Sequence, residues 1–356
     1  MIATADGILT GFRAGRTAAL ARAVSVVENR RDGADALLAE FHPLIGRARR
    51  IGITGPPGAG KSTITTFLAA NYREAGHRVG IVCVDPTSPF TGGALLGDRV
   101  RMESVALDEG VFIRSMATRG SLGGLAATTR EVADVLDAFG FDRILLETVG
   151  VGQSELDIAR TADSTIVTLV PESGDSIQML KAGVMEIADV FVVNKSDRPG
   201  ADRLRNDVEL MLGLRRGASF ARVPAHHGVD LTRIGSPARE AREAAHSESA
   251  GKWTPPVLRA VAAHGEGISE IIESLERHFN YLESSGELRA RRRRGLAERV
   301  TDAVDRRMKG RLWSSAQVTA WLEDRIPELE TATVTPYAVA DELLDRFGQL
   351  VTRADD

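Results

Sequence analysis

The length, composition and charge of the chain exclude several classes of protein. With 356 residues, 43% of them hydrophobic, it can bury one large core and still carry helical extensions. Its single cysteine, Cys83, excludes an intrachain disulfide framework and is expected to be a small core residue. It has no run of 18 apolar residues and no signal-peptide core, so we expect a soluble, cytoplasmic protein with no membrane partner; a transit peptide in the arginine-bearing N-terminal segment is the alternative.

The N-terminal segment is predicted to be helical. Between residues 11 and 48, alanine and leucine recur at spacings of three and four with arginines between them, which is the pattern of an amphipathic helix. We predict that residues 1–48 form an arm that packs against the main domain.

A glycine-rich motif follows the apolar run 51–54 and precedes a helix-forming segment, as a phosphate-binding P-loop does. Glycines allow successive backbone N–H groups to face a phosphate, and the helix N-terminus adds its positive end. Lys61 is expected to reach the β- and γ-phosphates, and Ser62 to bind Mg²⁺. The helix should end near Ala75 and Gly76. The predicted nucleotide-binding residues are Gly55, Pro56, Pro57, Gly58, Ala59, Gly60, Lys61, Ser62 and Thr63.

An acidic residue ends the next predicted strand, residues 79–84. Asp85 follows it directly, and a glycine-rich segment with Asp98 and Arg101 comes next. This position suits a switch loop that closes on Mg²⁺ and phosphate. Helix caps and solvated faces are the alternative roles for these side chains.

A second carboxylate ends the predicted strand 143–146. Glu147 lies where P-loop proteins place an acid that holds Mg²⁺ through water, and Gly150 where a backbone N–H senses the γ-phosphate. Val151 takes the place of the water-orienting glutamine of many signalling GTPases. We therefore expect slow intrinsic hydrolysis that a partner can activate.

Polar residues that a plain nucleotide fold does not need follow the predicted strand 165–170. Asp175 lies in the loop after it, and Gln178 and Lys181 lie one turn apart on the next helix. Helix caps and a solvated helix face are again the alternative roles for these side chains.

The base is indicated by an N-K-x-D motif after the predicted buried strand 189–193. The Asp197 carboxylate can accept from both the ring N–H and the amine of guanine, whereas adenine has no donor on its ring at that position. Asn194 and Lys195 are expected to tie this loop to the P-loop and to cover the base. Guanine is therefore favoured over adenine.

The C-terminal segment, residues 284–356, is again predicted to be helical and begins with an arginine run at 289–294. Such a run could contact nucleic acid, but it is more typical of a solvated helix face, and the net charge of −4 also disfavours a nucleic-acid partner. His226 and His227, as immediate neighbours, do not share a helix face, so we expect no dedicated metal site apart from Mg²⁺.

Strands that alternate with helices predict an α/β fold of the P-loop NTPase class, with a mostly parallel sheet flanked by helices and with helical N- and C-terminal arms. We expect an arm at 1–48, a GTPase domain at 49–283 with an insertion at about 214–252, and a C-terminal arm at 284–356.

The motifs together resemble those of the MeaB/MMAA-type metallochaperone GTPases, once labelled arginine-transport kinases. The resemblance lies in GPPGAGKST, VDPTSP, GDRVRM, RSMATRGSLGGL, ETVGVGQSE, ESGDSIQMLKAG and VVNKSD. It extends over nearly the whole chain, and the motifs after the P-loop are specific to this family.

The resemblance implies further roles. Asp85, Asp98 and Glu147 join Ser62 around Mg²⁺. Gln178 and Lys181 lie in a third switch loop that couples the nucleotide to a mutase. The backbone near Val261, Ala262 and Ala263 closes the base pocket, and the C-terminal arm makes a homodimer. The residues predicted to act in catalysis are Lys61, Glu147, Gly150, Gln178 and Lys181.

We therefore expect a homodimeric GTPase that uses GTP, GDP and Mg²⁺ to gate the loading and protection of an adenosylcobalamin-dependent acyl-CoA mutase. The cobalamin is bound through the partner only. Methylmalonyl-CoA mutase is the expected partner, with an isobutyryl-type mutase also open. A P-loop kinase and a nucleic-acid-associated GTPase are the alternatives.

Overall fold

A computed structural model describes most of the chain. The described residues are 5–85, 102–117, 124–148, 154–172, 184–215 and 252–352. Of the predicted site residues, Asp98, Gly150, Gln178 and Lys181 lie outside these ranges, as does nearly all of the insertion expected at about 214–252.

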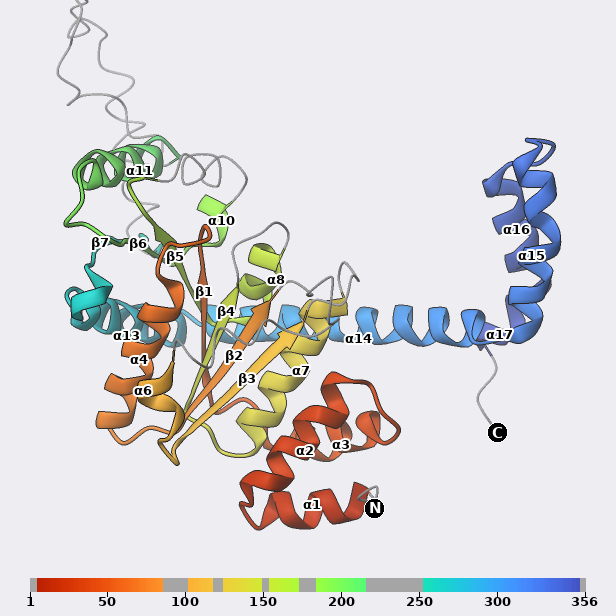
Figure 1. The fold of residues 1–356 in the computed structure, drawn as a ribbon, viewed down its shortest axis with the longest axis horizontal. Helices are drawn as coiled ribbons and strands as arrows, with labels where there is room; N and C mark the ends of the chain where they lie inside the picture. The colour runs from red at the N-terminus through yellow and green to blue at the C-terminus, as the bar shows by residue number, and fades with distance from the viewer. Residues whose placement is uncertain are drawn as a thin grey trace, which may run out of the picture. The chain divides into compact units, whose positions relative to one another are not determined.

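The larger part of the chain is built around a seven-stranded sheet in the order β3-β2-β4-β1-β5-β6-β7 (Figure 1). Every pair of neighbouring strands is parallel, so the chain must cross over the sheet between strands. Parallel strands bring their carboxyl ends to one edge, which is where ligands bind in such sheets. The strands are β1 (Arg49–Thr54), β2 (Val79–Asp85), β3 (Val111–Ala117), β4 (Arg143–Thr148), β5 (Ser164–Leu169), β6 (Val190–Val193) and β7 (Val257–Arg259).

Helices cover both faces of this sheet. On one face, side chains from α1, α2, α3, α7 and α8 form a core with Val82, Ile144 and Leu146 of the strands. On the other face, side chains from α4, α6 and α13 form a core with Ile53, Ile81 and Leu145. None of the helices in the described ranges is both long and apolar enough to span a membrane. The helices of this part are α1 (Ala5–Arg13), α2 (Thr17–Glu28), α3 (Ala34–Phe41), α4 (Lys61–Glu74), α6 (Glu103–Ala106), α7 (Gly124–Ala138), α8 (Ser154–Thr161), α10 (Met185–Ile187), α11 (Ala201–Arg215) and α13 (Ile268–Ser284).

The predicted fold class is confirmed. The strands expected at 51–54, 79–84, 143–146, 165–170 and 189–193 are present, and α4 ends at Glu74, beside a left-handed Gly76. The helical pattern predicted over 11–48 is present as three helices, α1, α2 and α3. The turns between them contain Gly15 and Gly33, whose positive φ angles (71° and 87°) are incompatible with a right-handed helix.

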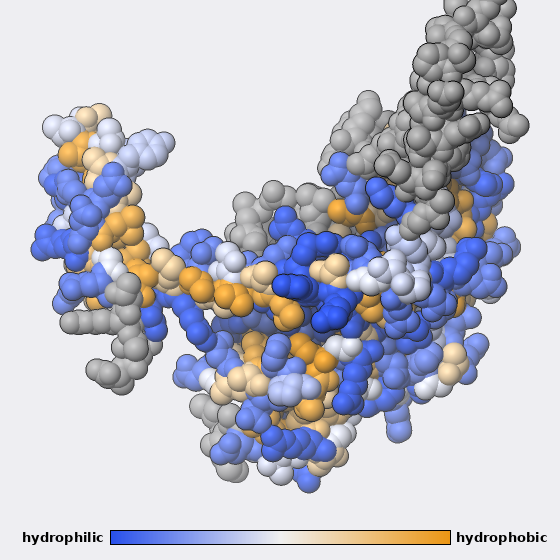
Figure 2. Space-filling view, turned by 180° about the vertical axis from the view of Figure 1, so that it is seen from behind, coloured by the Kyte–Doolittle hydropathy of each residue, from blue (hydrophilic) through white to orange (hydrophobic). Residues whose placement is uncertain are grey.

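The chain folds into two compact units, Met1–Arg289 and Ala290–Asp356. Helix α14 (Glu287–Trp313) begins in the first and continues in the second. It carries exposed apolar side chains at intervals of four residues, and Figure 2 shows apolar side chains in a row along it. These side chains, which we call the α14 apolar row, are Leu296, Val300, Val304 and Met308.

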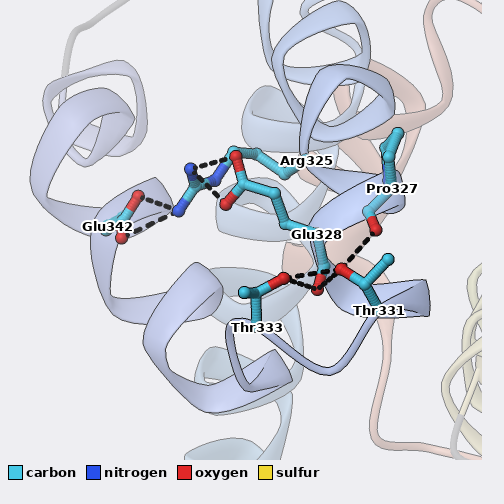
Figure 3. Close-up of polar contacts among 6 residues, drawn as sticks. All are labelled: Arg325, Pro327, Glu328, Thr331, Thr333 and Glu342. Carbon is cyan, nitrogen blue, oxygen red and sulfur yellow. Dashed lines mark hydrogen bonds and ion pairs between the residues drawn. The ribbon is translucent and has the colours of Figure 1, made fainter.

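The second unit has a small core of its own, built around Val318 and Leu343. It contains α15 (Ala316–Glu330), α16 (Pro336–Phe347) and α17 (Gln349–Thr352). Arg325 of α15 points to Glu342 of α16 and bonds both its carboxylate oxygens at 2.9 and 3.0 Å (Figure 3). Both bonds come from Nη2 of the guanidinium to an exposed carboxylate, so this ion pair adds to the apolar contacts between the two helices and contributes little by itself.

Candidate nucleotide-binding site

The P-loop connects β1 to α4 at the carboxyl edge of the sheet. Gly55 has a φ of 144°, and a Cβ there would lie 2.1 Å from the carbonyl oxygen of Thr168. Gly60 has a φ of 88°, and a Cβ there would lie 2.3 Å from Nδ2 of Asn194. Gly58 is also left-handed (φ 72°), but a Cβ there would have no atom of the described residues within 4 Å. The loop therefore needs glycine at 55 and 60 to pack against its neighbours, and Gly58 leaves room beside the backbone.

Lys61 supplies a positive charge inside this loop. Its side chain is buried, and Nζ donates to the carbonyl oxygens of Gly55 at 2.9 Å and Pro56 at 3.0 Å. Lys61 is also the first residue of α4, where backbone N–H groups have no partner within the helix. The cation and these N–H groups together make a site that attracts an anion such as a phosphate.

Glu147 lies beside the start of α4, near the end of β4. It is almost fully buried, and both of its carboxylate oxygens accept hydroxyl hydrogen bonds. Ser62 bonds Oε1 at 2.5 Å, and Thr65 bonds Oε2 at 2.8 Å. Hydroxyl and carboxylate oxygens are the ligands that Mg²⁺ prefers, so the chemistry of Ser62 and Glu147 fits that ion.

Asn194 joins three segments of the site. Its Nδ2 donates to the carbonyl oxygen of Ala59 in the P-loop at 2.8 Å, and its Oδ1 accepts the backbone N–H of Ala262 at 3.0 Å. The N-K-x-D loop is thus tied to the P-loop, which is the arrangement that the sequence predicts. Lys195 is partly buried with a φ of 55°, and Asp197 is exposed to solvent.

The turn after β7 completes this group. Val261 is paired with Glu266 across a short antiparallel bridge, Ala262 is buried and Ala263 is exposed. Ser196 reaches the same segment, because its backbone N–H and its hydroxyl both bond the carbonyl oxygen of Ala260 at 3.0 Å. The segments predicted to surround a base are thus neighbours in space, and their part in recognising guanine stays a prediction.

The acidic residue predicted before the first switch loop lies at the same edge. Asp85 is the last residue of β2, and β2 pairs with β4 so that Cys83 is level with Glu147. The predicted contributions of Asp98, Gly150, Gln178 and Lys181 stay predictions, since these four residues are outside the described ranges.

Two features of the site were not predicted from the sequence. Thr65 contacts Glu147, and the hydroxyl of Thr148 bonds that of Thr54 at 3.0 Å across β4 and β1. The sequence does hold a signal for Thr65, because it lies three residues after Ser62 and so on the same side of α4. The Thr54–Thr148 bond can be predicted only if β1 and β4 are known to be neighbours in the sheet, and no sequence motif gives this strand order.

The opposite end of β1 is held by a buried ionic cluster. Arg50 donates to Asp134 at 2.8 Å and to Asp137 at 3.0 Å, and all three side chains are buried. Burial by itself lowers the pKa of Arg50, but the two carboxylates more than offset it and raise that pKa, so the guanidinium stays charged. The cluster fixes the strand that leads into the P-loop.

The fold and the site define a P-loop nucleoside triphosphatase with a parallel sheet. A family model described as "Methylmalonyl Co-A mutase-associated GTPase MeaB" matches residues 20–317. The chain therefore belongs to the MeaB family, and the predictions of this family and of a GTPase are confirmed.

Relatives and a solved structure agree with this assignment. A putative GTPase of Pyrococcus abyssi is 41% identical over 95% of each chain. The mouse protein named methylmalonic aciduria type A homolog, mitochondrial, is 35% identical over 81% of this chain and 66% of its own. A crystal structure described as a LAO/AO transport system kinase has a TM-score of 0.64 and 26% identity, and the match covers 98% of this chain and 99% of that one.

Proposed function

We propose that this GTPase gates the loading of adenosylcobalamin into an adenosylcobalamin-dependent acyl-CoA mutase and protects the loaded mutase. Membership of a family described as methylmalonyl-CoA mutase-associated is the observation that carries the proposal. Methylmalonyl-CoA mutase is the first candidate for the partner, and an isobutyryl-type mutase is the second. Cobalamin is handled by the partner, and the chain itself binds the nucleotide.

The site geometry supports the nucleotide half of the proposal. Lys61 and the first turn of α4 attract the phosphates, and the left-handed Gly58 leaves space beside them. Asn194 holds the N-K-x-D loop against the P-loop, and this contact supports the proposal that Asp197 reads the base. GTP in its triphosphate form and GDP after hydrolysis are the proposed ligands.

Mg²⁺ is the proposed metal, with Ser62, Asp85, Asp98 and Glu147 as the residues that hold it directly or through water. The oxygen pair of Ser62 and Glu147 suits this hard cation. When bound, Mg²⁺ offsets the negative charge of the phosphates. The chain contributes Lys61 as a second positive charge, and Gly150, Gln178 and Lys181 are proposed to sense or transmit the state of the γ-phosphate.

A homodimer is the proposed assembly. The α14 apolar row lies on a helix that is otherwise rich in charged residues, and its side chains are exposed in the single chain. Apolar side chains at four-residue intervals form a stripe on a helix, and such a stripe packs well against a second helix. A second copy of the chain offers the same stripe.

Replacement of Lys61 by alanine tests the nucleotide half. Removal of one group that stabilises developing charge costs roughly 100- to 1,000-fold in turnover, so we expect kcat for GTP hydrolysis to fall at least about 100-fold. The fold should be retained, as shown by an unchanged circular dichroism spectrum. Wild-type turnover in this variant would place hydrolysis elsewhere, and transfer of labelled γ-phosphate to an acceptor in place of its release would identify a kinase.

The mutase half is tested with purified partners. Wild-type protein and Lys61→Ala are each mixed with cobalamin-free methylmalonyl-CoA mutase and adenosylcobalamin, with GTP, with GDP or without nucleotide. Binding of cobalamin to the mutase is followed by absorbance. We expect the rate of binding to depend on GTP with the wild-type protein, and the variant to lose that dependence. Rates that are identical under the three conditions would contradict the gating role.

A further inference from the structure

Glu147 and two hydroxyl side chains are brought together by the geometry of one strand and one helix. Side chains alternate along β4, so Glu147 shares a face with Leu145, which packs in the core under α4. On α4, Ser62 and Thr65 are three residues apart and lie on one side of the helix. The carboxylate therefore has a hydroxyl bonded to each of its oxygens.

The two hydroxyls differ in depth. Thr65 is fully buried, whereas Ser62 is partly exposed at the mouth of the site. The terminal torsion of a glutamate side chain is broad, so one hydrogen bond leaves its carboxylate plane poorly defined. A second bond to the other oxygen restricts that rotation. Thr65 supplies this second bond from the interior, at 2.8 Å.

We propose that Thr65 is a positioning residue for Mg²⁺ binding: it holds Oε2 of Glu147 so that Oε1 stays bonded to Ser62, which would bind the metal. The inference rests on the proposed function, since Mg²⁺ is part of that proposal. Thr65 itself does not bind the metal. Its hydroxyl orients the Glu147 carboxylate, which would hold the metal, and loss of a hydrogen bond that orients a metal ligand lowers metal affinity by roughly 10- to 100-fold.

The hydroxyl of Thr65 has a second acceptor within its own helix. It lies 2.9 Å from the carbonyl oxygen of Lys61, one turn earlier. Such back-bonding is common for threonine in helices and is not needed for the helix to form. Thr65→Val keeps the branched shape and replaces the hydroxyl with a methyl group, so this variant should fold.

The neighbouring Thr66 provides a matched control. It makes the same kind of back-bond, from its hydroxyl to the carbonyl oxygen of Ser62 at 2.7 Å, and this bond does not involve Glu147. Thr66→Val removes a hydroxyl and one back-bond from the same helix. Thr65→Ser removes a methyl group and keeps the hydroxyl that bonds the carboxylate.

The experiment measures the affinity of the full chain for a fluorescent GDP analogue during a titration with Mg²⁺, and again in EDTA. Thr65→Val should raise, by roughly 10- to 100-fold, the Mg²⁺ concentration that gives half of the maximal gain in affinity for the analogue. In EDTA, the affinity of this variant for the analogue should stay within about twofold of wild type. Thr65→Ser and Thr66→Val should both stay within about threefold of wild type in the titration.

Two results would overturn the inference alone. The first is a Thr65→Val variant that titrates like wild type. The second is a variant that loses affinity equally in EDTA and in Mg²⁺, which would mark a purely structural residue. If the wild-type protein bound the analogue with no dependence on Mg²⁺ at all, the proposed metal site itself would fail. The wild-type titration thus separates the two failures.

Discussion

At the scale of single residues, Asn194 links the phosphate loop to the loop proposed to read the base. Its amide donates to Ala59 on one side and accepts from Ala262 on the other. Both partners are backbone groups, so replacement of the buried Asn194 side chain would take a hydrogen-bond partner from each of them, and a buried polar group left unsatisfied costs about 1–3 kcal/mol. The spacing between the two loops is therefore set by one side chain.

Gly60→Ala tests this dependence. The new methyl group would meet Asn194 Nδ2 at 2.3 Å, so the link to Ala59 must move. We expect guanine-nucleotide affinity to fall by up to about tenfold, because loss of one net hydrogen bond costs about 0.5–1.5 kcal/mol. Isothermal titration calorimetry with GDP and Mg²⁺ measures the change.

Gly76→Ala is the matched control. Gly76 has nearly the same φ (84°) but lies at the other end of α4, where the added carbon would meet no atom of the described chain within 4 Å. The left-handed strain of about 1–2 kcal/mol should lower stability in both variants, while affinity falls only in Gly60→Ala. Equal affinities for the two variants would show that contact with Asn194 does not matter.

The residues of the site were predictable where a local motif carries them. Lys61 and Ser62 follow from the glycine spacing of the P-loop, and Asn194 follows from the N-K-x-D motif; a predicted strand precedes each of the two motifs. Thr65 did not follow, because threonine is common in helices and its partner, Glu147, is 82 residues away. A contact between distant segments needs the fold, and a single sequence does not provide it.

At the scale of elements, the joint between β1 and α7 depends on Asp137. Its carboxylate accepts the backbone N–H groups of Gly46, Arg47 and Ala48 at 2.8–3.1 Å, as well as the Arg50 guanidinium. One buried carboxylate thus holds the segment before β1 and the first part of the strand against α7.

Asp137→Ala should be strongly destabilising. Arg50 keeps Asp134 as a partner, so its ion pairing is weakened and not abolished. Three backbone N–H groups lose their acceptor as well, which costs about 1–3 kcal/mol for each one that stays buried. Urea denaturation followed by circular dichroism should show the loss as a lower midpoint. Glu40→Ala, which breaks the exposed Arg13–Glu40 pair, should change stability by less than about 1 kcal/mol. Similar midpoints for the two variants would contradict the assigned role of Asp137.

The elements that the sequence did not predict have identifiable causes. Arg114 interrupts the apolar pattern of β3, and its charge is balanced by Glu28 of α2, 86 residues earlier. Strand β7 spans three residues after Pro256 and is too short for a periodic signal, yet the carbonyl oxygen of Pro256 accepts the N–H of Phe191 and β6 extends the pairing. Both strands depend on neighbours that are remote in sequence.

At the scale of the whole molecule, the two units have separate cores, and the nucleotide site belongs to the first. The arginine run indicated a long helix after residue 284, and α14 is 27 residues long. Because most residues of this helix are charged or polar, its composition does not indicate the α14 apolar row. The row becomes evident only from the positions of its four side chains on the helix.

Substitution of Val300 and Val304 by glutamate tests the homodimer. If the α14 apolar row packs against a second copy, each buried valine contributes about 1.5–3 kcal/mol, so the dimer dissociation constant should rise at least about 100-fold. Light scattering across a dilution series measures this change. Lys309→Glu, an exposed change on the side of the helix away from the row, should leave the dimer intact. A double variant that dimerises like wild type would exclude this row as the interface.

The bonds from Lys61 to the carbonyl oxygens of Gly55 and Pro56 mean that the loop orients its cation with its own backbone. A substitution that shifts either peptide group would therefore also shift the charge that the loop presents to an anion, even if Lys61 itself is unchanged.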